Sequence, residues 1–329
     1  MRERLSSKDM RSAAVLLLLA VGCRASETPP APQRAPAPER AAAPSSATAP
    51  AELALGADAA PPEVAKVPVA EPPPPYPWGA TASDRLDARF PPPDGFARVR
   101  LEEGTFGAFL RTLPLLPGDA KVVDYRGNAL YDDGRHANIS AVVDIDVGSR
   151  DLQQCADAVV RMHAEWRYAR GDRDVTYRAA SGTPLSYRRW LAGDRAALDK
   201  GTLGVTRAAG PGKDAHGTYR AWLDEVFAWT NTAALERDAA RVAFADLAPG
   251  DFFVMSGSPF GHAVLVLDLA KDASGRLAML LGQSFMPAQS FHVLRPSRDA
   301  TWFVVEPDAK EVVTPFWAPF PASALRRRP

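Results

Sequence analysis

The chain has 329 residues, and 46% of them are hydrophobic, which is enough to bury a large core. Its 39 basic and 39 acidic residues give a formal net charge of zero. This balance argues against nucleic-acid binding by bulk electrostatics, and the short basic tail at residues 326–328 does not change it. The 31 prolines are unevenly placed, so the folded part is shorter than the chain.

Residues 1–23 have the pattern of an export signal: a basic start, an apolar run over residues 13–21, and then Gly22-Cys23. The string LAVGC that ends at Cys23 resembles the lipobox of bacterial lipoproteins. This resemblance implies that signal cleavage leaves Cys23 lipidated at the new N-terminus. An ordinary cleaved signal is the alternative, whereas the apolar run is far shorter than the roughly 20 residues that a membrane span needs.

Residues 24–77 are dominated by Ala, Pro, Glu and Ser and end in EPPPPYP. Such a composition cannot form a core and favours extended polyproline segments, so it predicts a disordered, semi-rigid linker. Aromatic residues return from Tyr76 onward, which marks the start of a globular domain at residues 78–329. A lipid anchor followed by this linker is expected to hold the domain away from a membrane surface.

The first predicted elements of the domain are short. Residues 96–101 alternate as a strand does, and residues 105–111 have the i, i+3, i+4 apolar spacing of a helix with Thr105 as its N-cap. Two further strands are predicted at residues 121–125 and 141–147, because apolar runs there are separated by turn signals.

Residues 151–167 switch to helical periodicity. One apolar stripe repeats at spacings of three and four, and it consists of Leu152, Cys155, Val159, Met162 and Trp166. Ser149 or Asp151 is expected to cap this helix, which places Cys155 in its first turn or so. At that position the helix dipole lowers the pKa of a thiol.

Cys155 has two interpretations. As a nucleophile it would be assisted by Gln153 or Gln154, whose side-chain amide can donate to an oxyanion. As a core residue it would be inert, because cysteine is among the most buried residue types and belongs in an apolar stripe. If Cys23 is lipidated, Cys155 is the remaining thiol and cannot form an internal disulfide.

The polar residues around this helix are predicted to be solvent-exposed. Arg161 and Glu165 belong to its polar face, and His216 lies in a polar, glycine-containing segment at residues 170–218 from which no chemistry can be read. A wide apolar stripe then predicts a helix at residues 218–232 that docks on the sheet.

Residues 250–294 have the pattern of an antiparallel β-meander. Apolar runs at residues 252–254, 262–269 and 277–281 are separated by turns that contain Gly, Ser and Asp. The middle run is almost continuously apolar, which favours a central strand covered on both faces. A last strand is expected at residues 291–294.

His262 starts the middle strand of this meander, behind flexible glycines. If the hairpin that follows is centred near residues 272–273, His262 faces Gln283 across the two strands. A histidine with an amide partner can act as a catalytic base with its orienting group. The alternative is a histidine that closes its strand by a backbone hydrogen bond, and His292 is the competing histidine for a catalytic role.

The order of these features resembles the papain-like cysteine amidases and endopeptidases of bacterial cell walls, the NlpC and CHAP group. The likeness is carried by the helix-borne Cys155, by the string GDFFVMSGSPFGHAVLVLD at residues 250–268, and by a polar residue on the next strand. It implies a papain-like α+β fold in which an antiparallel β-meander packs against the cysteine-bearing helix. It also implies that Cys155 attacks an amide, His262 is the base and Gln283 orients the imidazole, while Gln154 or nearby backbone N–H groups stabilise the oxyanion.

Almost all of residues 84–329 is similar to the bacterial family catalogued as domain of unknown function 4846. The strings that carry this likeness are FGAFLRTLPLL, DIDVGSRDLQQCADA, GDFFVMSGSPFGHAVLV and QSFMPAQ, at residues 106–116, 144–158, 250–266 and 283–289. That family brings no established activity, so the resemblance implies a relationship and no chemistry.

Together these patterns predict a lipoprotein of the bacterial cell envelope, attached to a membrane by its lipid and facing the periplasm or the exterior. The first functional hypothesis is a thiol amidase or peptidase that cleaves amide bonds of peptidoglycan or envelope peptides without a cofactor. The second is a non-catalytic lipoprotein that binds cell-wall glycan or peptide with a degenerate amidase-like fold. Metal binding by Cys155, His262 and His292 lacks any ligand-spacing motif.

Overall fold

The computed structural model describes residues 76–80, 82 and 84–329. The predicted signal at residues 1–23, the lipidation of Cys23 and all but the last two residues of the predicted linker lie outside the described residues, so they stay predictions. Among the described residues, no helix combines the length and the apolar character that crossing a membrane requires.

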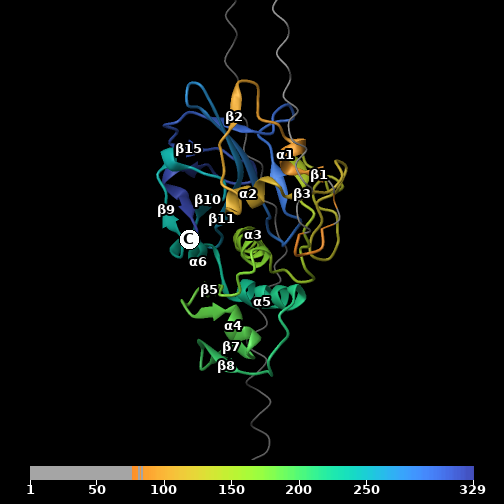
Figure 1. The fold of residues 1–329 in the computed structure, drawn as a ribbon, viewed down its shortest axis with the longest axis vertical. Coiled ribbons are helices and arrows are strands. Elements are labelled where there is room, and N and C mark those ends of the chain that lie inside the picture. Colours follow the sequence, from red (N-terminus) through yellow and green to blue (C-terminus); the bar gives the residue numbers. More distant parts are fainter. Residues whose placement is uncertain (1–75, 81, 83) are drawn as a thin grey trace, which may run out of the picture. The chain divides into compact units, whose positions relative to one another are not determined.

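A large antiparallel sheet organises the described part of the chain (Figure 1). Its central strand is β11, His262–Asp272, which lies between β10, Phe252–Met255, and β12, Leu277–Gln283. The outer strands are β13, His292–Leu294, and β4, Ile139–Val142, beyond β12, and β17, Leu325–Arg327, and β9, Ala240–Arg241, beyond β10. In addition β2, Phe96–Arg98, pairs with β11, and β14, Phe303–Val305, pairs with β12. The predicted α+β class with an antiparallel meander is confirmed.

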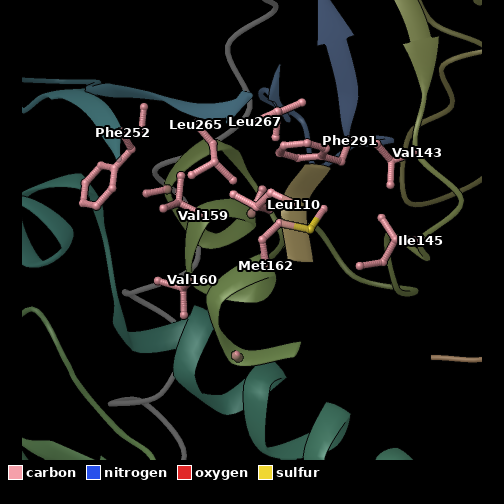
Figure 2. Packing of buried hydrophobic residues seen from close by; sticks show 14 of the residues in the cluster. Leu110, Val143, Ile145, Val159, Val160, Met162, Phe252, Leu265, Leu267 and Phe291 are labelled. Carbon is pink, nitrogen blue, oxygen red and sulfur yellow. The ribbon is translucent and has the colours of Figure 1, made fainter. Parts of the chain in front are cut away.

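The side chains of β11 divide the core into two parts. Ala263 and Leu265 face one hydrophobic cluster, called here the helix-side core, which includes the apolar face of α3, Cys155–Ala169 (Figure 2). Val264 and Val266 face the second cluster, called here the far-side core. Because side chains alternate along a strand, the apolar run of β11 covers both faces, as expected of a central strand. Burial of each Val or Leu side chain contributes roughly 1.5–3 kcal/mol.

One charged side chain lies within this apolar strand. Asp268 is fully buried, and its carboxylate accepts hydrogen bonds from Nε of Arg98 at 2.7 Å and from Nε of Arg111 at 2.8 Å. Arg98 lies on β2 and Arg111 ends α2, Phe106–Arg111, so the two ion pairs tie the N-terminal part of the domain to its central strand. A buried carboxylate requires such partners, because an uncompensated buried charge costs about 3–5 kcal/mol.

The helices pack mainly on the helix-side core. α3 contacts β11, and α5, His216–Trp229, contacts α3 on the side away from that strand (Figure 1). The predicted N-cap of α2 is confirmed, because Oγ1 of Thr105 accepts a hydrogen bond from the backbone N–H of Ala108 at 3.3 Å. The two remaining short α-helices of this part are α1, Leu86–Arg89, and α6, Thr232–Arg237.

Between α3 and α5 the chain forms an excursion of two hairpins joined by a short helix. The hairpins pair β5, Thr176–Arg178, with β6, Pro184–Ser186, and β7, Asp194–Asp199, with β8, Thr202–Arg207, while α4 spans Tyr187–Leu191. The smaller elements elsewhere are β1, Asp84–Arg85, with β3, Pro114–Leu115; β15, Glu311–Val312, with β16, Phe320–Pro321; and the 3₁₀ turns Phe244–Asp246 and Ala322–Ala324.

Two strand predictions need correction. Residues 121–125 form isolated bridges instead of a strand, because the side chain of Asp124 accepts hydrogen bonds from backbone N–H groups two and four residues later, at 2.8 and 2.9 Å, and bends the chain into a turn. The strand predicted at residues 141–147 is β4, which starts earlier and already ends at Val142.

The predicted exposure of the polar residues around α3 is wrong. Arg161 and Glu165 are 0% exposed, and His216 is only partly exposed because its Nε2 lies 2.8 Å from Oε2 of Glu165. The physical reason is that α3 lies between β11 and α5, so no side of its first eleven residues faces water.

Candidate functional site

Cys155 is the first residue of α3, in the first turn as predicted. The helix nevertheless begins later than expected, because its N-cap is Gln154 rather than Ser149 or Asp151. The side chain of Asp157 accepts a hydrogen bond from the backbone N–H of Gln154 at 3.3 Å and so holds this first turn. Asp151 instead uses its carboxylate to accept a backbone N–H from the loop after β12 at 2.7 Å.

The thiol of Cys155 lies against the backbone of the central strand. Its sulfur is 3.8 Å from the carbonyl oxygen of Gly261, and the backbone N–H of Ala263 is also directed at it. These two peptide groups flank His262. The sulfur therefore lies beside the backbone of His262, the residue that the sequence predicts to be its base.

The expected lowering of the Cys155 pKa is wrong. Burial raises the pKa of the thiol to about 11, and the nearby carboxyl of Asp157 acts in the same direction. The backbone N–H groups of Ala263 and Ala156 lower it, but less than burial raises it. Burial destabilises the thiolate more than the N–H groups at the helix N-terminus stabilise it, so the side chain of the free protein is a neutral thiol.

A hollow of about 260 Å³ opens at the N-terminus of α3, and Cys155 is among its lining residues. Its walls come from the start of α3, from the connection between α5 and α6, and from the loop before β11. Phe260 at its edge is 61% exposed, whereas Cys155 is 4% exposed. The thiol thus borders a space that a substrate group can enter, although little of its own surface faces water.

His262 is fully buried at the start of β11, and its Nε2 is 2.8 Å from Oε1 of Gln283. The predicted proximity of these two side chains is confirmed. The ring also packs against Phe285 and Trp317, at centroid distances of 5.0 and 4.9 Å. Burial lowers the pKa of His262 to about 4, so the imidazole is neutral at pH 7. Its Nδ1 is buried and has no hydrogen-bond partner among the described residues.

The predicted strand register is wrong, although the contact it predicted is present. Lys271 pairs with Leu277, which centres the hairpin on Ser274 rather than near residues 272–273. An irregularity between Val266 and Asp268 shifts the pairing once more. His262 consequently reaches Gln283 as a diagonal neighbour, which long polar side chains on adjacent strands can do.

The side chains of Cys155 and His262 lie on opposite sides of the backbone at the start of β11. Ala263 faces the helix-side core, so His262, one residue earlier, projects to the opposite face, where Trp317 and Phe320 contact its ring. Within the described part of the chain, no hydrogen bond joins the Cys155 sulfur to the imidazole. The sulfur lies beside the backbone of His262, and the ring lies on the far side.

His292 lies next to His262 and Gln283, although the sequence indicated it only as an alternative to His262 for the catalytic role. It pairs with Gln283 across β12 and β13, and the two Nε2 atoms are 3.4 Å apart. Its Nδ1 is 2.9 Å from the carbonyl oxygen of Ser290. Burial lowers the pKa of His292 to about 4. We call His262, Gln283 and His292 the imidazole cluster.

The family of the chain is shown by comparison with known proteins. A family model described as Domain of unknown function (4846) matches residues 86–327. The chain belongs to this family. No curated protein and no solved structure matches the chain. The match runs from α1 to β17, so Cys155 and the whole imidazole cluster lie inside the domain that defines this 4846 family.

The predicted oxyanion donor of this 4846-family domain has its amide engaged elsewhere. Nε2 of Gln154 donates to Oδ1 of Asp151 at 3.0 Å. The backbone N–H groups of Cys155, Ala156 and Ala263 are directed at the sulfur. These backbone groups therefore lie better placed than the Gln154 side chain to meet charge that develops next to the thiol.

Asp157 is a candidate residue that sequence reasoning missed. It lines the same hollow as Cys155, is 7% exposed, and accepts a hydrogen bond from Oγ1 of Thr230 at 3.0 Å. Burial raises the pKa of this carboxyl to about 7. The available signal was its spacing, since two residues after a cysteine in the first turn is still inside that turn.

A second polar cluster crosses the middle of α3. It consists of Asp146, Gln153, Arg161, Glu165 and His216, and we call it the ion network. Arg161 donates to Glu165, Asp146 and Gln153 at 2.7, 2.6 and 2.8 Å. The described residues hold no group of three or more His, Cys, Asp and Glu side chains arranged to bind a metal ion.

Proposed function

We propose that this protein is a thiol hydrolase, an amidase or peptidase that cleaves amide bonds of cell-wall or envelope peptides. Cys155 is the nucleophile, His262 the base, and Gln283 the group that orients the imidazole. One observation carries the proposal: the thiol lies against the peptide groups that flank His262, a neutral histidine with Nε2 on Gln283 and a buried Nδ1 that has no partner among the described residues. A neutral imidazole that is held through one nitrogen can accept a proton on the other.

The chemistry proceeds from neutral groups. A substrate carbonyl enters the hollow, the Cys155 sulfur forms a bond to its carbon, and the thiol proton passes to Nδ1 of His262. This transfer requires the start of β11 to rearrange so that the imidazole reaches the helix side of the strand. Backbone N–H groups at Ala156 and Ala263, or the Gln154 amide, hold the oxyanion. Collapse breaks the C–N bond, and the amine leaves with the proton from His262. Water then attacks the thioester, restoring the thiol and releasing a carboxylic acid.

The order of these groups along the chain supports a papain-like fold as part of the same proposal. A cysteine begins a helix that packs on an antiparallel sheet, a histidine begins the central strand, and a polar side chain follows on the next one. Core packing alone does not demand this order. The proposal predicts that a solved structure of the domain superimposes on papain-like hydrolases through α3, β11 and β12.

We propose further that the protein is a lipoprotein of the cell envelope, with lipid on Cys23 and the segment 24–77 as its spacer. Peptidoglycan or envelope peptide is then the substrate within reach of the domain. A Cys23→Ser variant should lose detergent partitioning and lipid label while keeping the folded domain. A wild-type protein that is soluble and label-free would contradict this anchoring.

The binding-module alternative is favoured by two observations. Cys155 is 4% exposed, and burial raises the pKa of its thiol to about 11. Both are properties of an inert core cysteine. Under this alternative the hollow beside Phe260 binds a cell-wall peptide without cleaving it.

The test uses purified peptidoglycan and short envelope peptides, with newly released amino groups as the readout. The wild-type protein should release amines, and Cys155→Ala or His262→Ala should reduce the rate by about 10²–10⁴-fold. His136→Ala is the matched control, because this histidine has no hydrogen bond to Gln283 within the described structure. Equal release by the Cys155→Ala variant would sink the proposal.

Alkylation by iodoacetamide separates the enzyme from the binding module. In the free, folded protein the reaction at Cys155 should be slow at pH 7 and should accelerate as the pH approaches the thiol pKa of about 11. Addition of a cleavable peptide should protect the thiol by forming a thioester. If the thiol reacts only after denaturation and no amine is released, the binding module becomes the better description.

A further inference from the structure

The hydrogen bonds of His292 have a direction that propagates to His262. The carbonyl oxygen of Ser290 can only accept, so the bond of 2.9 Å places the proton of His292 on Nδ1. His292 is fully buried and neutral at pH 7, and a neutral imidazole carries one ring proton. Its Nε2 is therefore an acceptor.

The orientation of the Gln283 amide follows from this acceptor. The group that faces Nε2 of His292, at 3.4 Å, is the NH₂ of Gln283, which is a donor. Because an amide has its oxygen opposite its NH₂, Oε1 of Gln283 is directed at His262, 2.8 Å from Nε2. That oxygen can only accept, so Nε2 of His262 carries the proton.

The result is one defined tautomer of His262. With its proton on Nε2, the neutral ring keeps its lone pair on Nδ1, the buried atom without a partner in the described part of the chain. This nitrogen keeps the lone pair that a base needs. The opposite tautomer would have an N–H at this position and could not act as a base.

We propose that His292 is a positioning residue that fixes the tautomer of His262 through the Gln283 amide. The two ends of a glutamine amide have nearly the same shape, so Gln283 alone does not choose which end faces His262. Rotated by half a turn, its NH₂ would donate to Nε2 of His262 and force the proton onto Nδ1. The acceptor on His292 removes that choice.

The surroundings of His292 keep it in the required state. The ionisable groups that act on it are His262 and His136, and both oppose its protonation. The ring of Phe316 covers it at a centroid distance of 6.3 Å. A protonated His292 would present an N–H to Gln283 instead of a lone pair, so exclusion of water and of carboxylate partners maintains the acceptor.

The catalytic meaning of this tautomer rests on the proposed function, whereas the tautomer itself does not. The first measurement is therefore ¹⁵N NMR of the full chain labelled at histidine, because protonated and unprotonated ring nitrogens have different chemical shifts. In the wild type at pH 7, His262 should show a protonated Nε2 and an unprotonated Nδ1. A His262 that carries its proton on Nδ1 overturns the proposal outright.

The variants test the causal role of His292. In His292→Phe the Gln283 amide is free to rotate, and His262 should become a mixture of both tautomers. His136→Phe is the matched control, since it makes the same substitution in a histidine that packs on Phe316 but does not bond to Gln283 in the described structure, and it should leave the wild-type tautomer unchanged. Unchanged His262 signals in folded His292→Phe overturn the proposal.

A rescue variant distinguishes positioning from structural support. A carboxylate at position 283 can only accept, so Gln283→Glu combined with His292→Phe should restore the proton to Nε2 of His262 without any help from position 292. Failure to restore it in a folded double variant contradicts the relay. If His292→Phe does not fold, the wild-type spectrum still decides the question, because the relay requires His292 to carry its proton on Nδ1 and His262 to carry its proton on Nε2, and any other pattern overturns it.

Hydrolysis provides the second readout. In the serine proteases a wrongly held histidine tautomer costs about 10⁴-fold in kcat. His292→Phe should lower kcat in proportion to the share of His262 that loses its proton from Nε2, about 2-fold for an even mixture, with little change in KM. Adding Gln283→Glu should recover kcat. If the tautomers behave as proposed but no amine is ever released, the hydrolase proposal fails and the relay stands. If hydrolysis is present and His292→Phe changes neither the tautomer nor kcat, the relay fails.

Discussion

The imidazole cluster and the ion network are two buried polar groups that differ in charge and in how completely their hydrogen bonds are satisfied. The ion network is charged, and the guanidinium of Arg161 is held by three partners at 2.6–2.8 Å. The imidazole cluster is neutral and leaves Nδ1 of His262 without a partner among the described residues. A satisfied cluster holds elements together, whereas an unsatisfied buried atom stores the cost of a missing bond until a ligand or reactant supplies it.

The largest expected effect comes from breaking the ion network. Arg161→Met leaves the buried carboxylate of Glu165 without its main partner, so the free energy of unfolding should fall by about 3–5 kcal/mol. Urea denaturation measures this. Arg188→Met is the matched control, because Arg188 makes an exposed 3.6 Å pair with Asp174 and its loss should cost less than about 1 kcal/mol. Equal stability of the two variants would mean that Glu165 finds other compensation.

The imidazole cluster should show itself through pH instead. Burial lowers the pKa of both His262 and His292 to about 4, below the 6.5 of an unfolded histidine. The unfolded chain therefore binds more protons as the pH falls, so the contribution to stability is fully present above pH 6.5 and is lost as the pH falls through about 4. Each histidine accounts for a loss on the order of 3 kcal/mol.

Denaturation at pH 7 and pH 4.5 tests this pH dependence. His163 has a pKa of about 3 because of its burial and adds to the slope in the same direction, so the wild type alone cannot assign it. His292→Phe should reduce the difference in unfolding free energy between the two pH values, while His136→Phe should change it much less. A slope that is insensitive to His292 would contradict its buried, neutral state.

The smallest expected effect concerns the outer edge of the ion network. His216 has a partly exposed side chain, and its Nε2 lies 2.8 Å from Glu165. His216→Gln should cost about 1 kcal/mol, because a neutral amide can replace this hydrogen bond in part and Arg161 still holds the carboxylate. Thermal unfolding of His216→Gln beside Arg161→Met would rank the two contacts. A larger loss of stability in His216→Gln than in Arg161→Met would show that Arg161 is not the main partner of Glu165.

Local patterns carry most of the fold that could be predicted. The strands β10 to β13 follow from apolar runs, and α5 follows from its wide stripe, because periodicity and turn residues are written in consecutive positions. The N-cap at Thr105 is equally local. Arg161 and Glu165 could not be placed correctly, since their burial depends on α5, a helix more than fifty residues later that covers the polar side of α3.

The candidate site divides in the same way. The pairing of His262 with Gln283 could be predicted from a hairpin, even with the wrong register, because long side chains bridge diagonal positions. The pKa of Cys155 could not, since it depends on how much water the folded chain removes. The role of His292 was also hidden, because two hydrogen-bond directions and a glutamine amide must be known together before its partner is defined.

Asp268 has a further consequence during folding. The strand around it is a long run of β-forming apolar residues, and β2, which pairs with it, comes from about 170 positions earlier in the sequence. Until that distant strand arrives, such a run can stack against the same run of another copy. A carboxylate in its middle makes that stacking unfavourable, because identical charges would meet in each layer. Asp268, which pairs with Arg98 and Arg111 in the folded domain, thus disfavours aggregation while the domain is still unfolded.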